Sequence, residues 1–324
     1  MDFRKEALEI IREKTAIVFA GGGTLGVAAV GALEKLEENG LDLKQIRSVS
    51  GSSVGSILAT ALTCGADVKY MKNKLDSIDF QKLMNKKCFL VQGINLIKDY
   101  GLHEMSEVRN FVASVFTDLG FNPDITFKEL FEKTGVWLTI TYLSMNYGRT
   151  IFADHIYEPT SSVRETIVKS SAIPIFYEAY FEGYGKDRQV SVDGGTIDLY
   201  PFRAERYKNI PLHEIIGLKF VSSEEKEFTD EGQPGTIDEN KGAPSNIISY
   251  LENLFEIIRK QAMKLHVKNS DWLNTVKINI GNFSSTDFNL TQSQKDWLFE
   301  QGEKAIEDYI QELSDNLKDG KYVF

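Results

Sequence analysis

The residues best suited to chemistry in this sequence lie in a short segment flanked by glycines. Gly51-Ser52-Ser53-Val54-Gly55 matches the pattern G-x-S-x-G, in which a sharp turn from strand to helix exposes the middle serine. The flanking glycines supply the room that a strained turn needs. A helix that follows directly would present free N–H groups and the positive end of its dipole to developing negative charge. The pattern therefore predicts Ser53 as a nucleophile for acyl transfer.

A glycine-rich segment, Gly21-Gly22-Gly23-Thr24-Leu25-Gly26, precedes the serine motif. It matches the dinucleotide fingerprint G-x-G-x-x-G, which also calls for an acidic residue about twenty positions further on, at the end of the second strand. Here that strand ends at Ser50, and the nearest acid, Asp42, precedes the strand. The same loop can form an oxyanion hole, in which the amides of Gly22 and Gly23 point at a carbonyl oxygen as it becomes negative. We favour the oxyanion hole, because a serine turn needs such a loop and a dinucleotide site needs no serine turn.

Asp193-Gly194-Gly195 is the candidate partner of the serine. It lies between two β-like runs, Gln189–Val192 and Thr196–Leu199, which favours a plain hairpin turn. A hairpin tip can also place a carboxylate beside a nucleophile, so the two interpretations are compatible. A histidine base is less favoured, because His213 and His266 follow the serine but neither lies in a turn-rich segment.

The elements around these motifs predict a parallel sheet. Thr15–Ala20 is an apolar run that ends in glycines, as is typical of a buried strand, and Val27–Asn39 has apolar residues at helical spacing. Ile46–Ser50 is predicted as a second strand that runs into the serine motif, and Val54–Thr63 as a helix of small residues. This alternation indicates an α/β fold with three layers, in which helices cover both faces of a mostly parallel central sheet.

The rest of the chain continues this pattern. Further strands are predicted at Trp137–Leu143, Arg149–Ala153, Ile215–Val221 and Thr275–Ile280. Further helices are predicted at Met1–Lys14, Val163–Lys169, Ile247–His266 and Gln292–Leu317, and Ala66–Phe116 is predicted to be mostly helical. Ser222–Asn246 is polar and acidic, with glycines and prolines, and is predicted as a flexible loop. No repeat or linker divides the chain, so we expect a single domain over residues 1–324, with its core at about 15–221 and a closing segment at 247–324.

Composition and charge argue against several classes of protein. The net charge of −10 disfavours binding to nucleic acid, which needs clustered cations. The two cysteines and four scattered histidines form neither a disulfide framework nor a metal-ligand spacing, so we expect no metal or cofactor. Thr15–Leu33 is uncharged, but its glycines would break a membrane-spanning helix. The N-terminus lacks the pattern of a signal peptide, so we expect a cytoplasmic protein or one at the membrane periphery.

Taken together, the three motifs resemble those of the patatin-like phospholipases. That family's signature is a glycine-rich oxyanion block, then G-x-S-x-G, then D-G-G or D-G-A, and all three occur here in that order. The segment Ser170–Phe176 resembles the family's serine, proline and phenylalanine block, and Asn282–Ile310 resembles bacterial and viral members. The likeness runs from about Ile17 to Pro201. The resemblance implies a Ser53–Asp193 dyad without a catalytic histidine, an oxyanion hole at Gly21, Gly22 and Gly23, and supporting motif glycines at Gly26, Gly51, Gly55, Gly194 and Gly195.

The implied reaction is a two-step cleavage of fatty-acyl esters of phospholipids or lysophospholipids. Ser53 attacks the ester carbonyl, Asp193 takes its proton, and water later cleaves the acyl-enzyme. An ordinary aspartate is a poor base, so we expect a partly desolvated Asp193 with a raised pKa. The expected partner is an acyl lipid, met through peripheral contact with a membrane of the same cell or of another. A scaffold that binds lipid or a partner without turnover stays open as an alternative, and a dinucleotide-binding oxidoreductase is disfavoured.

Three departures from the family pattern are expected to alter the cleft or the substrate preference. Leu25 stands where many relatives carry arginine or lysine, Tyr177 and Glu178 stand where proline is common, and Asp198 stands where asparagine is frequent. The apolar segment Phe89–Ile97 is predicted either to form an acyl-chain channel or lid, or to pack as a core helix.

Overall fold

The computed structural model describes residues 2–83, 95–222, 267–285 and 287–322, and a few isolated positions between 244 and 262. The predictions for Ser222–Asn246, and for most of Phe89–Ile97 and Ile247–His266, lie outside the described residues. Within the described residues, no helix is both long enough and apolar enough to cross a bilayer. Whether residues 1–324 form a single domain stays a prediction.

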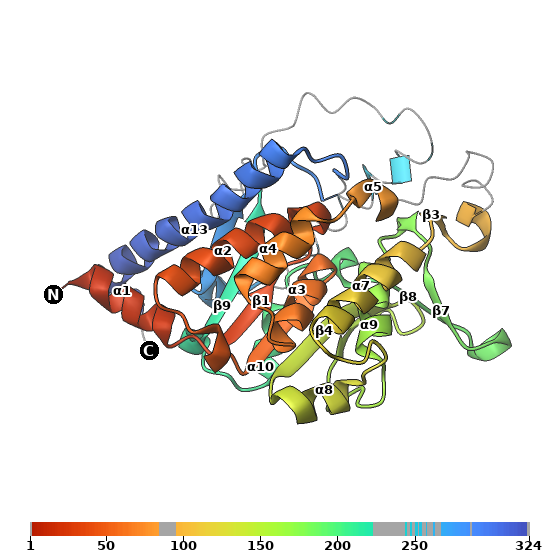
Figure 1. Ribbon diagram of the computed structural model, residues 1–324, viewed down its shortest axis with the longest axis horizontal. Coiled ribbons are helices and arrows are strands. Elements are labelled where there is room, and N and C mark those ends of the chain that lie inside the picture. The colour runs from red at the N-terminus through yellow and green to blue at the C-terminus, as the bar shows by residue number, and fades with distance from the viewer. Residues whose placement is uncertain are drawn as a thin grey trace.

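The centre of the described structure is an eight-stranded sheet with the order β10-β9-β1-β2-β4-β8-β7, to which β5 adds by pairing with β4 (Figure 1). Its strands are β1 (Ala16–Phe19), β2 (Ser48–Ser52), β4 (Trp137–Ser144), β5 (Arg149–Ala153), β7 (Tyr180–Glu182), β8 (Gln189–Asp193), β9 (Ile215–Val221) and β10 (Thr275–Asn279). The five strands from β10 to β4 are parallel, whereas β5, β7 and β8 pair in antiparallel fashion. A separate two-stranded ribbon joins β3 (Gly101–His103) to β6 (Ile175–Tyr177). The predicted mostly parallel α/β sheet is confirmed.

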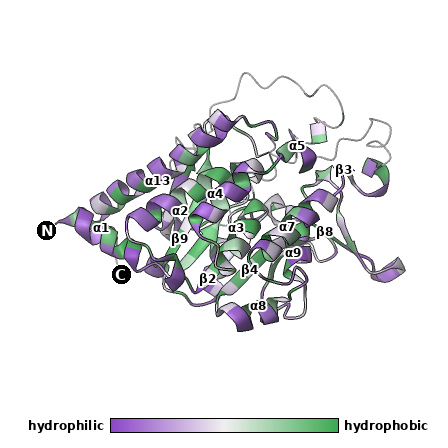
Figure 2. Cartoon of the chain, viewed as in Figure 1, coloured by the Kyte–Doolittle hydropathy of each residue, from purple (hydrophilic) through white to green (hydrophobic). Residues whose placement is uncertain are grey.

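Helices lie against both faces of this sheet. They are α1 (Phe3–Arg12), α2 (Gly26–Glu38), α3 (Val54–Thr63), α4 (Val68–Asp76), α5 (Phe80–Leu83), α7 (Ser106–Asp118), α8 (Phe127–Thr134), α9 (Val163–Ser171), α10 (Phe202–Tyr207), α12 (Asn269–Trp272) and α13 (Gln292–Lys318). Strand β1 is buried along its whole length: Ile17 and Phe19 join the large core with α2, α3 and α13, while Val18 packs against Phe202 at the start of α10. Figure 2 shows the resulting hydrophobic strands between amphipathic helices.

The C-terminal helix α13 closes the large core by packing along α2 (Figure 1). Small residues allow this close approach, because a Cβ added to Gly302 would lie 1.9 Å from the Ala28 carbonyl oxygen, and one added to Gly31 would lie 2.1 Å from that of Phe299. Helix α13 begins with a capping box between Thr291 and Gln294. The N-terminal and C-terminal parts of the chain therefore share one core.

The structure corrects one prediction near the candidate site. The run Thr196–Leu199 is not a strand, so the hairpin interpretation of Asp193-Gly194-Gly195 was wrong. The Asp193 carboxylate accepts the Gly195 amide at 2.5 Å and the Gly194 carbonyl accepts the Asp198 amide at 2.9 Å, which folds the chain into a tight turn that leads to α10. The region Ala66–Phe116 is mostly helical in its described residues, as predicted, with the short strand β3 between its helices.

Candidate active site

Ser53 lies at the turn between β2 and α3 with a strained backbone. Its φ of 52° and ψ of −129° are a conformation that side-chain-bearing residues rarely adopt, at a cost of about 1–3 kcal/mol. The two motif glycines make the turn possible, because a Cβ on Gly51 would lie 2.2 Å from the Gly55 carbonyl oxygen and one on Gly55 would lie 2.5 Å from that of Phe19. The side chain therefore stands at the carboxyl edge of the sheet, at the N-terminus of a ten-residue helix.

The loop Gly21-Gly22-Gly23 follows β1 and lies beside this turn. A Cβ built on Gly21 would lie 3.2 Å from the Cβ of Ser53, and one built on Gly23, where φ is +54°, would lie 1.9 Å from the Ser285 carbonyl oxygen. Gly26 is the first residue of α2, and a Cβ built on it would lie 2.8 Å from the Val54 side chain. Within the described part of the chain, the amides of Gly22 and Gly23 have no backbone or side-chain acceptor, so they are available to a ligand.

Asp193 ends β8 and reaches the same edge of the sheet. In the register of the sheet Asp193 lies opposite Tyr142, one residue along β4 from Thr141, which lies opposite Ser52. Its residue exposure is only 4%. The two glycines that follow pack tightly: a Cβ on Gly194 would lie 2.3 Å from the Thr141 carbonyl oxygen.

The end of α9 holds the serine turn and the aspartate strand in place. The Ser53 amide donates to the Ser170 hydroxyl at 2.8 Å, and that hydroxyl donates to the Thr141 carbonyl at 2.6 Å. Two residues further on, the Ala172 carbonyl accepts the Asp193 amide at 2.9 Å. The sequence placed Ser170 in a family block but did not predict its bridging role.

Leu199 packs against two of the predicted motifs, the glycine loop and the Asp-Gly-Gly turn, and the glycine loop in turn lies against Ser53. The Leu199 carbonyl accepts the Gly21 amide at 2.8 Å. One methyl group of Leu199 lies 2.5 Å from the position of a Cβ on Gly21 and 2.3 Å from that of a Cβ on Gly195. The structure therefore brings the glycine loop, the serine turn and the Asp-Gly-Gly turn together, although they lie far apart in sequence.

A buried charged pair, Glu205 and Lys208 in and just after α10, contacts β2 on the face of the sheet opposite to α3. Glu205 accepts the hydroxyl of Ser48 at 2.6 Å and that of Ser50, and Lys208 lies 2.9 Å from its carboxylate. Burial lowers the pKa of Lys208. The alternating small polar residues of β2 were the only sequence signal for this cluster, which supports the strand that carries Ser53.

The departures from the family pattern have defined surroundings. Leu25 is buried, and the Glu178 carboxylate accepts the Met105 amide at 2.9 Å. The Tyr177 hydroxyl donates to the Leu83 carbonyl at 3.2 Å. Asp198 pairs with Arg203 at 2.7 Å, yet burial raises the pKa of Asp198 to about 6.

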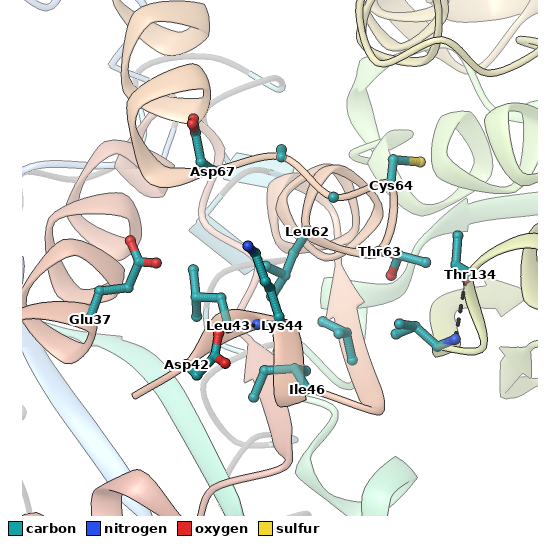
Figure 3. Close-up of a pocket in the computed structure, with 14 residues that line it drawn as sticks. Glu37, Asp42, Leu43, Lys44, Ile46, Leu62, Thr63, Cys64, Asp67 and Thr134 are labelled. Atoms are coloured by element: carbon teal, nitrogen blue, oxygen red, sulfur yellow. Dashed lines mark hydrogen bonds between the residues drawn. The ribbon is translucent and has the colours of Figure 1, made fainter. Parts of the chain in front are cut away.

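Two hollows in the described structure lie away from Ser53. One, of about 380 Å³, sits at the far end of α3, about 15 Å along the helix from Ser53. Figure 3 shows Glu37, Asp42 and Asp67 around it, together with Cys64, whose pKa burial raises to about 12. The other, of about 700 Å³, runs along β4 and β5. Neither is lined by Ser53 or Asp193, so neither is the candidate active site.

The surroundings of the glycine loop are inconsistent with a dinucleotide site. Strand β2 ends at Ser52 and runs into the serine turn, so it offers no carboxylate for a ribose. Asp42 lies before β2, where it caps the short helix Leu43–Gln45 by accepting the Lys44 amide.

Within the described residues, no group of three or more histidine, cysteine, aspartate or glutamate side chains could hold a metal ion.

A serine on a strained turn between strand and helix, beside a glycine loop at the carboxyl edge of an α/β sheet, is the geometry of an α/β enzyme with a nucleophile elbow. The sequence model of the patatin-like phospholipases matches residues 17–205, more than half of the chain. The chain belongs to the patatin-like phospholipase family. The predicted resemblance is thereby confirmed.

Individual relatives extend this comparison. Uncharacterized protein R571 of Acanthamoeba polyphaga mimivirus is 28% identical over 302 residues, which cover 92% of this chain and 94% of the relative. Triacylglycerol lipase 4 of Saccharomyces cerevisiae is 32% identical over 130 residues, which cover 40% of this chain and 14% of the lipase. The crystal structure of VipD from Legionella pneumophila has the same fold, with a TM-score of 0.56 at 17% identity over 94% of this chain and 67% of VipD.

Proposed function

We propose that this protein is a serine acyl hydrolase that cleaves fatty-acyl esters of phospholipids or lysophospholipids. The observation that carries the proposal is the convergence of the Ser53 turn with the Gly21–Gly23 loop and the Asp193 turn at one edge of the sheet. Membership of the family supports a lipid substrate. The similarity of part of the chain to a triacylglycerol lipase supports ester hydrolysis.

In the proposed mechanism, the Ser53 Oγ attacks the acyl carbonyl while Asp193 takes its proton. The Gly22 and Gly23 amides donate to the oxyanion of the tetrahedral intermediate, and one such donor typically contributes about 3–4 kcal/mol to the transition state. Collapse of the intermediate breaks the ester bond, and the proton passes from Asp193 to the departing alkoxide. Water then cleaves the acyl-enzyme by the same steps, with Asp193 as its base. The raised pKa of Asp193 stays a prediction, which the acid limb of a pH–rate profile would test.

A fluorophosphonate probe tests the nucleophile directly. We expect the wild-type protein to be labelled and Ser53→Ala to stay unlabelled. Ser52→Ala is the matched control, because Ser52 is the neighbouring serine of the same motif and its side chain lies against Gly194 instead; we expect it to be labelled. Labelling of Ser53→Ala, or none of the wild type, would contradict the proposal, and the second result would favour a scaffold without turnover.

Hydrolysis of a lipid panel tests the substrate class. We expect release of fatty acid from phosphatidylcholine or lysophosphatidylcholine at a higher kcat/KM than from triacylglycerol. A preference for triacylglycerol would preserve the serine mechanism and overturn the phospholipid part of the proposal.

A further inference from the structure

Two hairpin tips stand beyond the carboxyl edge of the sheet, on the side where Ser53 lies. Strand β8 runs antiparallel to β4, with Asp193 opposite Tyr142, so its first residue, Gln189, stands about 14 Å beyond Asp193. The β7–β8 tip at 183–188 extends further, and Figure 1 shows it as an arm that projects from the body of the molecule. The turn of the β4–β5 hairpin at 145–148 follows the carboxyl end of β4 and lies beside this arm.

The two tips are joined into one surface by Asn146. Its side-chain oxygen accepts the Val190 amide at 2.7 Å, and its side-chain nitrogen donates to the Arg188 carbonyl at 3.1 Å. The Met145 amide also donates to the Val190 carbonyl at 2.9 Å. Because the tips are already held together, docking them on a partner costs less conformational entropy than ordering two separate loops.

Large side chains are exposed on these tips. Tyr184 is 93% exposed, Tyr147 is 61% exposed and Met145 is 57% exposed. Tyrosine carries an apolar ring and a polar hydroxyl, a combination that is enriched where one end of the side chain is in an apolar medium and the other end is in water. We call this surface, residues 145–149 and 183–188, the docking platform.

The charge of the platform is opposite to that of the whole chain. It carries three cations, Arg149, Lys186 and Arg188, and one carboxylate, Asp187, whereas the net charge of the protein is −10. The Arg149 guanidinium lies 5.7 Å from the Tyr147 ring centre. At the base of the arm, the carboxylate of Glu182 is paired with Lys169 at 2.7 Å, which offsets its charge.

We propose that the docking platform binds the surface of an anionic phospholipid bilayer and presents that surface to Ser53. Tyrosines and a methionine would enter the headgroup region, while the neighbouring cations would meet the lipid phosphates. The inference rests on the proposed function, since it places the membrane at the edge of the sheet where the ester would be cleaved. It adds the part of the protein that makes the contact and the lipid charge that it prefers.

Co-sedimentation with vesicles tests the platform. The full chain would carry Ser53→Ala, so that lipid is not consumed, and the vesicles would contain phosphatidylcholine with or without phosphatidylglycerol. The test variant adds Tyr184→Ser and Lys186→Glu, two exposed changes at the tip of the arm. The matched control adds Tyr157→Ser and Lys128→Glu, which lie near the start of β4, at the end of this strand away from the platform. Tyr157 is 73% exposed and the Lys128 side chain is 64% exposed.

We expect the tip variant to lose at least about fivefold in affinity for the anionic vesicles, and the control to stay within about twofold. Binding of the parent protein is expected to weaken with salt and on neutral vesicles. A tip variant that binds like its parent, an equal loss in the control, or binding that is indifferent to lipid charge would overturn the proposal.

Kinetics on the active protein separate this inference from the proposed function. With the Ser53 side chain restored, we expect the tip variant to hydrolyse a short, water-soluble ester at the wild-type rate and to lose at least about fivefold in kcat/KM on anionic vesicles. Equal rates on vesicles would overturn the docking platform alone. Hydrolysis that persists in Ser53→Ala would overturn the proposed function, whatever the vesicle binding shows.

Discussion

The central sheet has an amino edge, where its parallel strands begin, and a carboxyl edge, where they end. These two edges use their polar groups in different ways. At the amino edge, the ammonium of Lys14, just before β1, donates to the His213 carbonyl at 2.7 Å and to the Asn274 side chain at 3.0 Å. These two residues lie just before β9 and β10. The amino edge therefore uses a buried lysine side chain to hold the starts of three strands together.

At the carboxyl edge, the residues of the candidate site have a strained backbone conformation or are closely packed against other backbone atoms. Ser53 has a positive φ. Gly23 can lie against the Ser285 carbonyl only because glycine has no Cβ. In open α/β sheets, ligands bind at the carboxyl ends of the strands. From this difference we expect that substitutions of buried polar residues lower the stability of the protein at the amino edge and its enzymatic activity at the carboxyl edge.

The largest expected effect comes from Asp193→Asn. We expect kcat to fall by about 10²–10⁴-fold, because the amide cannot take the proton of Ser53. The Gly195 amide can still donate to the asparagine oxygen, so the urea unfolding midpoint should change little. Full hydrolysis by this variant would show that Asp193 is not the base.

Asp271→Asn is the matched control at the amino edge. Asp271 is fully buried, accepts the Lys268 amide at 2.8 Å and lies 3.4 Å from Arg206. We expect it to lose about 1–3 kcal/mol of unfolding free energy and to keep its kcat. A large loss of kcat in this destabilised but folded variant would contradict the division between the two edges.

The next effect is that of Gly23→Ala in the loop. The added methyl group would meet the Ser285 carbonyl at a φ that alanine disfavours, so the loop must shift. We expect kcat/KM to fall by about 10²–10³-fold as an oxyanion donor moves. Gly65→Ala, also at positive φ but in open space, should cost about 1 kcal/mol of stability and leave the rate unchanged. Similar rates for the two variants would argue against the oxyanion role.

Ser170→Ala tests the positioning of the serine turn. Its hydroxyl holds the Ser53 amide and the Thr141 carbonyl, so we expect about a tenfold fall in kcat with little change in KM. Ser314→Ala in α13 removes another buried hydroxyl, which donates to the Ile310 carbonyl at 2.7 Å. Both variants should lose about 1–2 kcal/mol of stability, but only Ser170→Ala should lose activity. If both lose stability alone, Ser170 has no positioning role.

The last prediction concerns the pH dependence of stability at the amino edge. Burial lowers the pKa of Lys14 to about 7 in the folded protein. Between about pH 7 and the usual lysine pKa, the unfolded chain binds more protons than the folded one, so the contribution of Lys14 to stability rises with pH. We expect the stability of the wild type relative to Lys14→Met to increase by on the order of 2 kcal/mol between about pH 7.5 and pH 9. Urea titrations at both pH values measure this change, and a constant difference would contradict the lowered pKa.

Much of the fold and of the candidate site could be predicted from local patterns. The helix Val54–Thr63 has the predicted bounds, and β1, β5 and β9 lie within or on the predicted ranges. These elements carry strong periodicity or clear glycine ends, which depend only on neighbours in the sequence. The motifs for Ser53, Asp193 and the glycine loop were likewise recognisable because each is contiguous.

Other features required contacts between distant residues. The turn after Asp193 was predicted as a hairpin, since aspartate followed by glycine is also a hairpin signal. The outcome depended on the crossing of the chain to α10 and on the packing of Gly194 against the Thr141 carbonyl. The extension of α9 through Ser171, and the bond from Ser170 to Ser53, had no local signal.

By itself, the sequence determined which residues are chemically suited to acyl transfer and the α/β pattern that would carry them, because residue type and local spacing are properties of short segments. Only the tertiary structure decided that the three motifs lie against one another, that α9 supports two of them, and that two hairpin tips form one exposed surface beside them. Those arrangements depend on strand order and register, which arise from packing across the whole chain.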